Sequence, residues 1–322
     1  MASPAQRDLK QPILIVGTGA LATLFAARLS AIGHPISMLG SWKNGLQALN
    51  ENGARLVDTN GVEQAYPVDA TDNPADCKGA RYALVLVKSW QTERVARQLA
   101  DCLAEDGLAL TLQNGMGNRE LLAGALGLPF DVAQDTPRVA LGVTTTGATL
   151  LGPGLARAGG EGVISVEAHP RLGPLEAALS GAGFNVQVVN DADALVWGKL
   201  VINAAINPLT ALLRVPNGEL LQRPAAHKMM GILAQEAAAV ATAQGIHLPF
   251  EDAVTAAEDV ARKTAANHSS MFQDIRRGAP TEIDAICGAI TKTGEKLGVS
   301  TPVNRVCWHL TRASLPTMQR VQ

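Results

Sequence analysis

Short, continuous apolar runs recur through the first half of the chain. Each run is four to six residues long and is followed by glycine or polar residues, as is typical of strands buried on both faces of a parallel sheet. They occupy residues 12–16, 36–39, 82–87 and 108–112. The segment after the first run has helical periodicity, and we expect a helix between the last two that closes at 101–106. This alternation predicts an α/β domain.

The pattern then changes twice before it becomes helical. Residues 54–68 alternate enough to predict a hairpin, and the glycine- and threonine-rich stretch 139–166 predicts antiparallel strands added at the far edge of the sheet. A helix at 174–180 and a strand at 184–189 follow. Strand signals end near residue 190.

Everything after residue 190 has the pattern of helices, through about residue 296 and again at 303–314. A chain of 322 residues also exceeds the size of most single cores, which stop growing at about 250–300 residues. We therefore expect two domains, 1–190 and 191–322, the first α/β and the second all-α.

Three polar residues recur every four positions in the apolar run 197–217. They are Lys199, Asn203 and Asn207. Each step of four advances only about 40° around a helix, so the three groups share one stripe. Buried polar groups need partners. The stripe therefore either satisfies itself internally or faces a ligand, and we favour the ligand. Pro208 should kink or end this helix.

A glycine-rich turn links the first apolar run to the first helical segment. It consists of Gly17, Thr18, Gly19, Ala20, Leu21 and Ala22. Gly17 permits a tight turn, Gly19 lets the backbone approach a pyrophosphate, and Ala22 still allows close helix–strand packing. Amides at the start of the helix would hold the phosphates. Strand, turn and helix together predict a Rossmann-type dinucleotide-binding domain.

The end of the second run bears on the choice of cofactor. An NAD site usually has an acidic residue there for the ribose 2′-hydroxyl, but no carboxylate occurs before Glu51. Ser41 and Lys43 could instead hold a 2′-phosphate, with Trp42 against the adenine. We therefore favour NADP, although Lys43 is also consistent with a solvated loop residue.

Two further polar residues follow predicted strands. Lys88 comes after the run 82–87, and Asn114 after 108–112. Ligands of open parallel sheets bind beyond the carboxyl ends of the strands. Lys88 and Asn114 are therefore candidate cofactor or substrate residues, with helix capping as the alternative.

Composition narrows the classes of function. Net charge is −2, with 27 basic and 29 acidic residues, and aromatic residues make up only 3%. This favours neither nucleic acid nor an anionic membrane as a partner. The start of the chain lacks the apolar core of a signal peptide, and no uninterrupted apolar run reaches the roughly 18–20 residues of a membrane span. Four scattered cysteines form no CxxC pair, which predicts a cytoplasmic protein without a metal site.

Longer motifs make the chain similar to the ketopantoate reductase (2-dehydropantoate 2-reductase) family, from about residue 12 to 310. The glycine turn is shared with many nucleotide-binding enzymes. More diagnostic are the lysine–asparagine segment 199–210 and the segments 269–275 (Ser-Ser-Met-Phe-Gln-Asp-Ile) and 281–284 (Thr-Glu-Ile-Asp). The segments 88–91, 113–117 and 216–218 also match.

The resemblance implies an NADPH-dependent reduction of the 2-keto group of ketopantoate to pantoate, a step toward coenzyme A. Lys199 would be the general acid and Glu282 its partner. Substrate would be bound by Asn114, Asn203, Asn207, Asn217 and Ser270. Asn114 would also position the nicotinamide. The family often has an arginine just after the second strand; here Ser41 stands nearby, and Lys43 becomes the substitute.

The chemistry agrees with these roles, because reduction of a ketone builds negative charge on oxygen and a positioned proton donor neutralises it. Two other functions remain open. One is reduction of a different branched 2-keto acid, and the other is a sensor that binds NADPH without catalysis. A homodimer is a further possibility, because the alanine-rich stretch 234–243 fits either a core or an interface.

Overall fold

The computed structural model describes residues 12–127 and 137–314. The chain divides into two compact units. Unit 1 comprises residues 1–113 and 117–192, and unit 2 comprises residues 114–116 and 193–322. Each unit is described separately below.

Unit 1 is built on a twisted sheet whose described strands number eight, in the order β12-β11-β8-β7-β6-β1-β2-β5. The strands are β1 (Ile13–Val16), β2 (Ile36–Leu39), β5 (Asp69–Thr71), β6 (Ala80–Val85), β7 (Leu103–Thr111), β8 (Val139–Thr144), β11 (Val163–Glu167) and β12 (Asn185–Val189). The six strands from β8 to β5 are parallel, and β11 is antiparallel to β8. The predicted Rossmann-type fold is confirmed.

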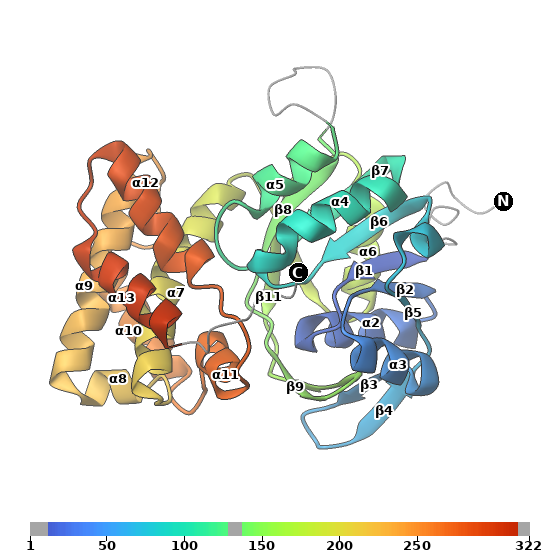
Figure 1. Cartoon of the computed structure of the whole chain (residues 1–322), viewed down its shortest axis with the longest axis horizontal. Coiled ribbons are helices and arrows are strands. Elements are labelled where there is room, and N and C mark those ends of the chain that lie inside the picture. Colours follow the sequence, from blue (N-terminus) through green and yellow to red (C-terminus); the bar gives the residue numbers. More distant parts are fainter. Residues whose placement is uncertain (1–11, 128–136, 315–322) are drawn as a thin grey trace. The chain divides into compact units, whose positions relative to one another are not determined.

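Helices cover both faces of this sheet (Figure 1). They are α2 (Ala20–Ala31), α3 (Lys43–Asn52), α4 (Thr92–Cys102), α5 (Asn118–Ala125) and α6 (Gly173–Gly181). Alternate residues of β1 belong to different cores: Ile13 and Ile15 pack with residues of α2 and α6, and Leu14 and Val16 with residues of α4 and α5. Burial on both faces explains why the strand is continuously apolar.

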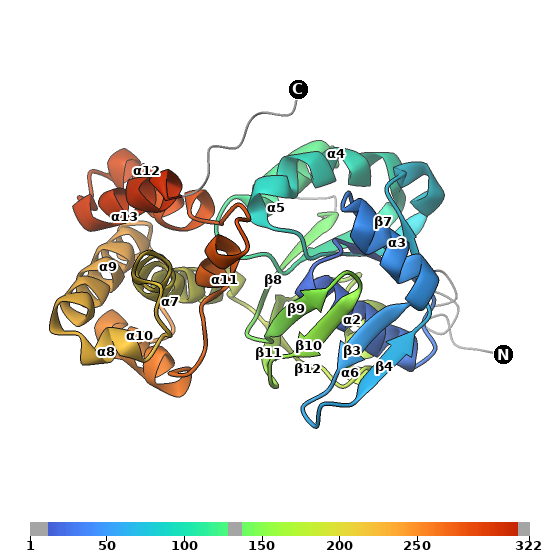
Figure 2. The ribbon, with the colours of Figure 1, turned by 60° about the horizontal axis from the view of Figure 1, so that its bottom comes forward.

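A second sheet in unit 1 contains the predicted hairpin. Its order is β4-β3-β10-β9, formed by β3 (Ala54–Val57), β4 (Glu63–Tyr66), β9 (Ala148–Gly152) and β10 (Leu155–Ala158). Figure 2 shows these four strands side by side. The hairpin at 54–68 is confirmed as the antiparallel pair β3–β4.

Two predictions for unit 1 are wrong. Residues 103–106 are strand, not helix, because α4 ends at Cys102 and β7 begins at once with Leu103 paired to Ala80. The first strand of the stretch 139–166 is not antiparallel: β8 pairs parallel with β7, and antiparallel pairing in the main sheet starts only at β11. The described connection between β7 and β8 contains α5, which reverses the chain and allows parallel pairing.

Helices are the only regular secondary structure among the described residues of unit 2, as predicted. It contains α7 (Ala192–Leu213), α8 (Glu219–Gln222), α9 (Pro224–Ala243), α10 (Ala253–Lys263), α11 (Ser270–Arg276), the π-helical turn η3 (Asp284–Gly288), α12 (Ala289–Leu297) and α13 (Pro302–Ala313). Its core gathers α7 and α9 around Leu200, Val201, Met230 and Leu233, each at most 1% exposed. The alanine-rich part of α9 contributes Ala234 and Ala237 to this core.

Helix α7 continues to Leu213, five residues beyond Pro208, so the proline does not end it. Proline removes one backbone donor from a helix. Two residues later, Thr210 Oγ1 lies 3.0 Å from the carbonyl oxygens of both Ile206 and Asn207. The Thr210 hydroxyl is therefore a side-chain donor within reach of the two carbonyls that precede the proline.

By length and hydropathy alone, α7 also passes the test for a membrane-spanning helix. This is weak support for a membrane role, since the core helix of a soluble protein passes the same test, and 67% of its most apolar window is buried inside the protein. The helix does not contradict the sequence prediction, because Lys199, Asn203 and Asn207 interrupt it and no uninterrupted apolar run reaches the length of a membrane span.

Candidate functional site

The glycine turn of unit 1 leaves the uncapped start of helix α2 open at the surface. Gly17 has φ 131°, and a Cβ there would lie 3.2 Å from the Leu86 carbonyl oxygen, so only glycine fits without strain. Gly19 is the exposed N-cap of α2, without a side-chain cap and with open space where a Cβ would point. Exposed amides at an uncapped helix start attract anions. Ala22 is fully buried behind them.

The remaining residues of the turn hold it in place. Thr18 is 7% exposed, and a Cβ on Gly40, at the end of β2, would lie only 2.6 Å from the Thr18 methyl carbon. Ala20 and Leu21 are half-buried in the first turn of α2. The Gly17 amide donates to the Leu39 carbonyl (2.8 Å). The ends of β1 and β2 are therefore in direct contact.

The loop after β2 carries the residues considered for the 2′-position of the ribose. Ser41 and Lys43 are both exposed, and Lys43 is the first residue of α3. Trp42 is the N-cap of α3 and keeps 38% of its surface exposed. The loop thus offers a hydroxyl, an ammonium and an indole.

The loops after β6 and β7 are joined by a half-buried amide that sequence analysis did not identify. Gln113 Nε2 donates to the Val87 carbonyl (3.1 Å) and to Thr92 Oγ1 (2.8 Å). Thr92 Oγ1 in turn donates to Asn118 Oδ1 (2.8 Å). This network fixes the strand end beside Lys88, which is half-buried and forms the N-cap of the 3₁₀ turn Ser89–Gln91. In the sequence, the only indication that Gln113 matters is its place in the segment 113–117, which matches the family.

In unit 2, the segment 114–116 packs against the start of η3 although it follows β7 in the chain. Asn114 Nδ2 donates to Glu282 Oε2 (3.1 Å), and the Met116 amide donates to the Ala285 carbonyl (3.1 Å). Between them Gly115 has φ 82°, and a Cβ there would lie 2.6 Å from the Ala285 carbonyl oxygen. Glycine at 115 is therefore what permits the approach. Asn114 and Glu282 are brought together.

Lys199 is the strongest electrostatic feature of this region. Desolvation by burial lowers the pKa of its ammonium to about 8, and the negative charge of Glu282 opposes that shift. Glu282 itself is only 5% exposed, so it is not a surface carboxylate. A lysine with a pKa near neutrality, next to a buried carboxylate, is typical of a group that exchanges protons.

The amides predicted on the same stripe lie on the same helix. Asn203 is half-buried and Asn207 is 6% exposed. Asn217 is 7% exposed. Its Nδ2 donates to Thr264 Oγ1 (2.9 Å), while its buried Oδ1 has no hydrogen-bond partner. An unsatisfied buried acceptor is unusual in a protein interior.

The serine pair 269–270 divides into two different environments. Ser269 is the N-cap of α11: its Oγ accepts from the Phe272 amide (3.1 Å) and lies 2.7 Å from Thr210 Oγ1 on α7. Ser270, the predicted carboxylate ligand, is exposed at the first position of α11. The link between Ser269 and Thr210 was not predicted, because it joins residues 59 positions apart.

Other chemistries find little support among the described residues. They contain no group of three or more histidine, cysteine or acidic residues that could hold a metal. All four cysteines are buried and free, and burial raises the pKa of the Cys102 thiol to about 12. Such a thiol is protonated at neutral pH and a poor nucleophile.

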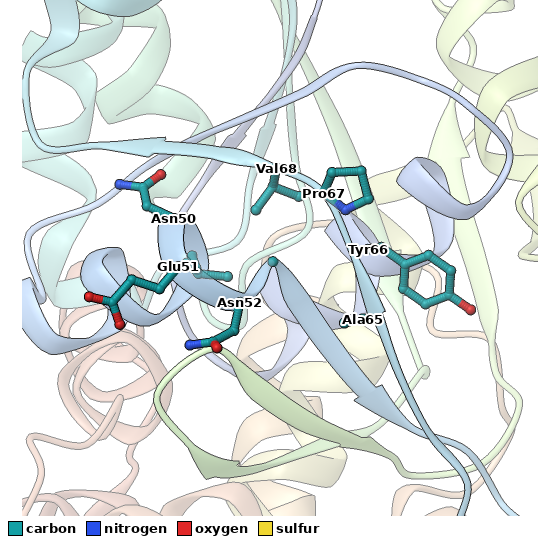
Figure 3. A pocket seen from close by; sticks show the side chains of 9 residues that line it. Asn50, Glu51, Asn52, Ala65, Tyr66, Pro67 and Val68 are labelled. Carbon is teal, nitrogen blue, oxygen red and sulfur yellow. The ribbon is translucent and has the colours of Figure 1, made fainter.

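A surface recess in unit 1 of about 310 Å³ is also not a plausible active site (Figure 3). It lies where α3 ends, beside Tyr66 and Pro67. The amide of Asn50 there exchanges two hydrogen bonds with the Ala70 backbone, at 2.7 and 2.8 Å. The Asn50 side chain therefore has a structural role. None of the predicted site residues lines the recess.

Comparison with known proteins agrees with the motifs. The family model described as ketopantoate reductase PanE/ApbA matches residues 13–171, and the one described as ketopantoate reductase PanE/ApbA C terminal matches residues 191–314. A 2-dehydropantoate 2-reductase of Archaeoglobus fulgidus is 36% identical over 313 residues, covering 94% of this chain and 97% of the relative. That of Halobacterium salinarum is 32% identical over 306 residues, covering 93% and 97%.

Solved structures give the same result. A PanE/ApbA family ketopantoate reductase from Ralstonia eutropha superposes with a TM-score of 0.85 at 30% identity, covering 94% of this chain and 98% of that one. D-mandelate dehydrogenase with NADH and anilino(oxo)acetate superposes with a TM-score of 0.84 at 25% identity, with the same coverage. The resemblance read from the sequence is confirmed, and this protein belongs to the ketopantoate reductase family of oxidoreductases.

Proposed function

We propose that this protein catalyses the NADPH-dependent reduction of the 2-keto group of ketopantoate to (R)-pantoate, a step in pantothenate and coenzyme A biosynthesis. The observation that carries the proposal is Lys199, an ammonium with a pKa of about 8 on an apolar helix, beside a buried carboxylate. Residues 1–190 would bind the cofactor and residues 191–322 the substrate.

In this proposal Lys199 is the general acid. When bound, the reduced nicotinamide supplies a hydride to the keto carbon. Lys199 Nζ donates its proton to the keto oxygen, so that a C–H and an O–H bond form as the C=O double bond becomes single. A donor whose pKa lies near the working pH transfers its proton more readily than an ordinary lysine with a pKa near 10.4.

Glu282 keeps this acid protonated. Burial alone would favour the neutral amine, and the carboxylate partly restores the charged form. The hydrogen bond from Asn114 holds one carboxylate oxygen in place. Asn114 thereby acts on Lys199 through Glu282, in addition to its proposed role beside the nicotinamide and substrate.

Substrate recognition in this proposal uses uncharged donors and one serine. Asn203, Asn207 and Asn217 would bind the hydroxyl and carboxylate ends of the keto acid, and Ser270 its carboxylate. The buried, unsatisfied Oδ1 of Asn217 supports this assignment, because a substrate hydroxyl would supply the missing donor. Amides add orientation without adding charge beside Lys199.

The glycine turn fits a dinucleotide, and the cofactor we propose is NADPH. Its pyrophosphate would lie on the amides of residues 17–22, and Lys88 would contact the cofactor at the end of β6. Ser41 and Lys43 would contact the 2′-phosphate, and the absence of an acidic residue after β2 supports NADPH. The D-mandelate dehydrogenase neighbour, in contrast, was solved with NADH.

That neighbour also motivates a second candidate, the reduction of another branched or an aromatic 2-keto acid by the same residues. The deciding experiment measures NADPH and NADH oxidation with ketopantoate and with a panel of 2-keto acids. We expect the highest kcat/KM with ketopantoate and NADPH. Turnover only of another keto acid rejects the substrate and keeps the chemistry. Tight NADPH binding without any turnover supports a sensor instead.

A further inference from the structure

The loop after β2 contains an arrangement of two residues that the proposed function leaves unused. Trp42 occupies the N-cap position of α3 without any side-chain cap hydrogen bond. Helices prefer serine, threonine, aspartate or asparagine there. Gly45 then stands inside the ten-residue helix α3, where glycine is disfavoured relative to alanine. Neither residue suits the helix, so another requirement must explain them.

The two residues explain each other. A Cβ on Gly45 would lie 2.5, 3.0 and 3.1 Å from Trp42 Cε3, Cδ2 and Cζ3. These are its three nearest neighbours, so the indole itself covers Gly45, which is buried. Any side chain at 45 would push the indole away. Glycine at this position is therefore a seat for the Trp42 ring.

The seated ring still presents a large apolar surface. Trp42 keeps 38% of its surface exposed, although aromatic residues are only 3% of the chain. An indole fixed against backbone on one side and open on the other is suited to stacking on a planar ring. Little conformational freedom is lost on binding, because the ring is already held.

Position in the fold identifies the ring that would stack there. β2 pairs parallel with β1, and Gly40 at its end touches Thr18 of the glycine turn. A dinucleotide whose pyrophosphate lies on that turn extends its adenosine toward the end of β2, where the ribose is read. Trp42 stands between Ser41 and Lys43, the two residues assigned to the 2′-position. The adenine is the next group along.

We propose that Trp42, seated on Gly45, is the stacking surface for the adenine of the cofactor, with Gly45 as a positioning residue. The inference rests on the proposed function for the identity of the ligand. In this proposal the Trp42 indole provides the contact that binds the adenine, and Gly45 holds the indole in place without touching the ligand.

The test measures binding by calorimetry with three probes: NADPH, ADP and reduced nicotinamide mononucleotide, which has no adenine. Replacing an aromatic side chain that stacks on a base by alanine typically decreases the affinity by about 5- to 150-fold. We expect Trp42→Ala to lower the affinity for NADPH and for ADP by a factor in that range and to leave the affinity for the mononucleotide unchanged. Trp42→Phe should retain most of the affinity.

Gly45→Ala tests the seat while keeping the indole. We expect about a threefold or larger loss for ADP and NADPH, without a loss of thermal stability that would signal unfolding. The matched control is Gly124→Ala in α5, another helical glycine of unit 1, whose Cβ would meet nothing within 4 Å. It should change none of the three affinities.

Two results overturn the inference: ADP and NADPH binding to Trp42→Ala with wild-type affinity, or equal loss of all three probes in that variant. Absence of ADP binding to the wild-type protein also overturns it. Because ADP binding needs no keto acid, a failure to reduce any substrate would reject the proposed function separately. Unchanged ADP binding in an active reductase would reject only the stacking surface.

Discussion

Replacing Glu282 by glutamine removes one negative charge and almost nothing else. Glutamine has the same shape, and its carbonyl oxygen can still accept the hydrogen bond that Asn114 donates to Oε2 at 3.1 Å. The charge of Glu282 opposes the desolvation that lowers the pKa of Lys199 to about 8. Without that charge, the pKa of Lys199 must fall further.

The size of the effect follows from the interaction of neighbouring opposite charges, which shifts a pKa by about 1–3 units. With the smallest of these shifts, the pKa of Lys199 becomes about 7 in the variant. If protonated Lys199 is the acid, the rate is proportional to its protonated fraction. The variant should then be about tenfold slower at pH 9 and almost equal to wild type at pH 6.

The assay is kcat/KM for keto acid reduction between pH 6 and 10, at saturating NADPH. Wild type should lose activity as the pH rises through about 8. Glu282→Gln should lose activity at a pH at least one unit lower. Asp284→Asn is the control, because that carboxylate is 59% exposed and two residues away. A pH-independent loss in Glu282→Gln, or a move of the alkaline limb to higher pH, would refute the reasoning.

Three further predictions use stability and affinity. The pKa of Lys199 in the folded protein is lowered from 10.5 to about 8, so the free energy of unfolding of the wild type should rise between these pH values, by at most about 1.4 kcal/mol per pH unit. Urea unfolding of Lys199→Met should not show this rise. Equal pH dependence of stability in the two proteins would contradict the lowered pKa. Gly17→Ala should lower the free energy of unfolding by about 1–3 kcal/mol through backbone strain, and a variant as stable as wild type would exclude that strain. Gly19→Ala, in contrast, should keep the wild-type Tm and bind NADPH more weakly. Ser269→Ala should lower the free energy of unfolding by about 1 kcal/mol, because α11 loses its N-cap. Ser270→Ala should raise KM for the keto acid and leave Tm unchanged. The reverse pattern would exchange the two roles.

The parts of the fold that sequence analysis identified correctly have local signals. Continuous apolar runs predicted β1 and β2, and the glycine turn predicted the start of α2, because burial on both faces and the turn geometry act within a few residues. The stripe of Lys199, Asn203 and Asn207 also follows from helical spacing alone.

The wrong predictions involve pairing between distant segments. In β7, the residues from Leu103 to Leu108 span the same stretch of the partner strand as Ala80 to Tyr82, so the strand bulges outward. Its polar Glu105 and Asp106 are exposed there and resemble a helix end in sequence. The direction of β8 depends on α5, a helix that the sequence analysis did not identify.

The same limit applies to the candidate site. The contact of Asn114 with Glu282 joins residues 168 positions apart and depends on the left-handed backbone of Gly115. The Gln113 amide network depends on which loops become neighbours in the sheet. Residue types and spacing identify candidate groups, but only tertiary packing determines which of them meet.

Lys199→Ala tests the central claim most directly. The variant should bind NADPH with an affinity within about twofold of wild type, since Lys199 is not among the residues proposed to hold the cofactor, while kcat falls by about 10²–10⁴ with loss of the proton donor. A variant that reduces the keto acid at the wild-type rate would contradict the assignment of Lys199 as the acid.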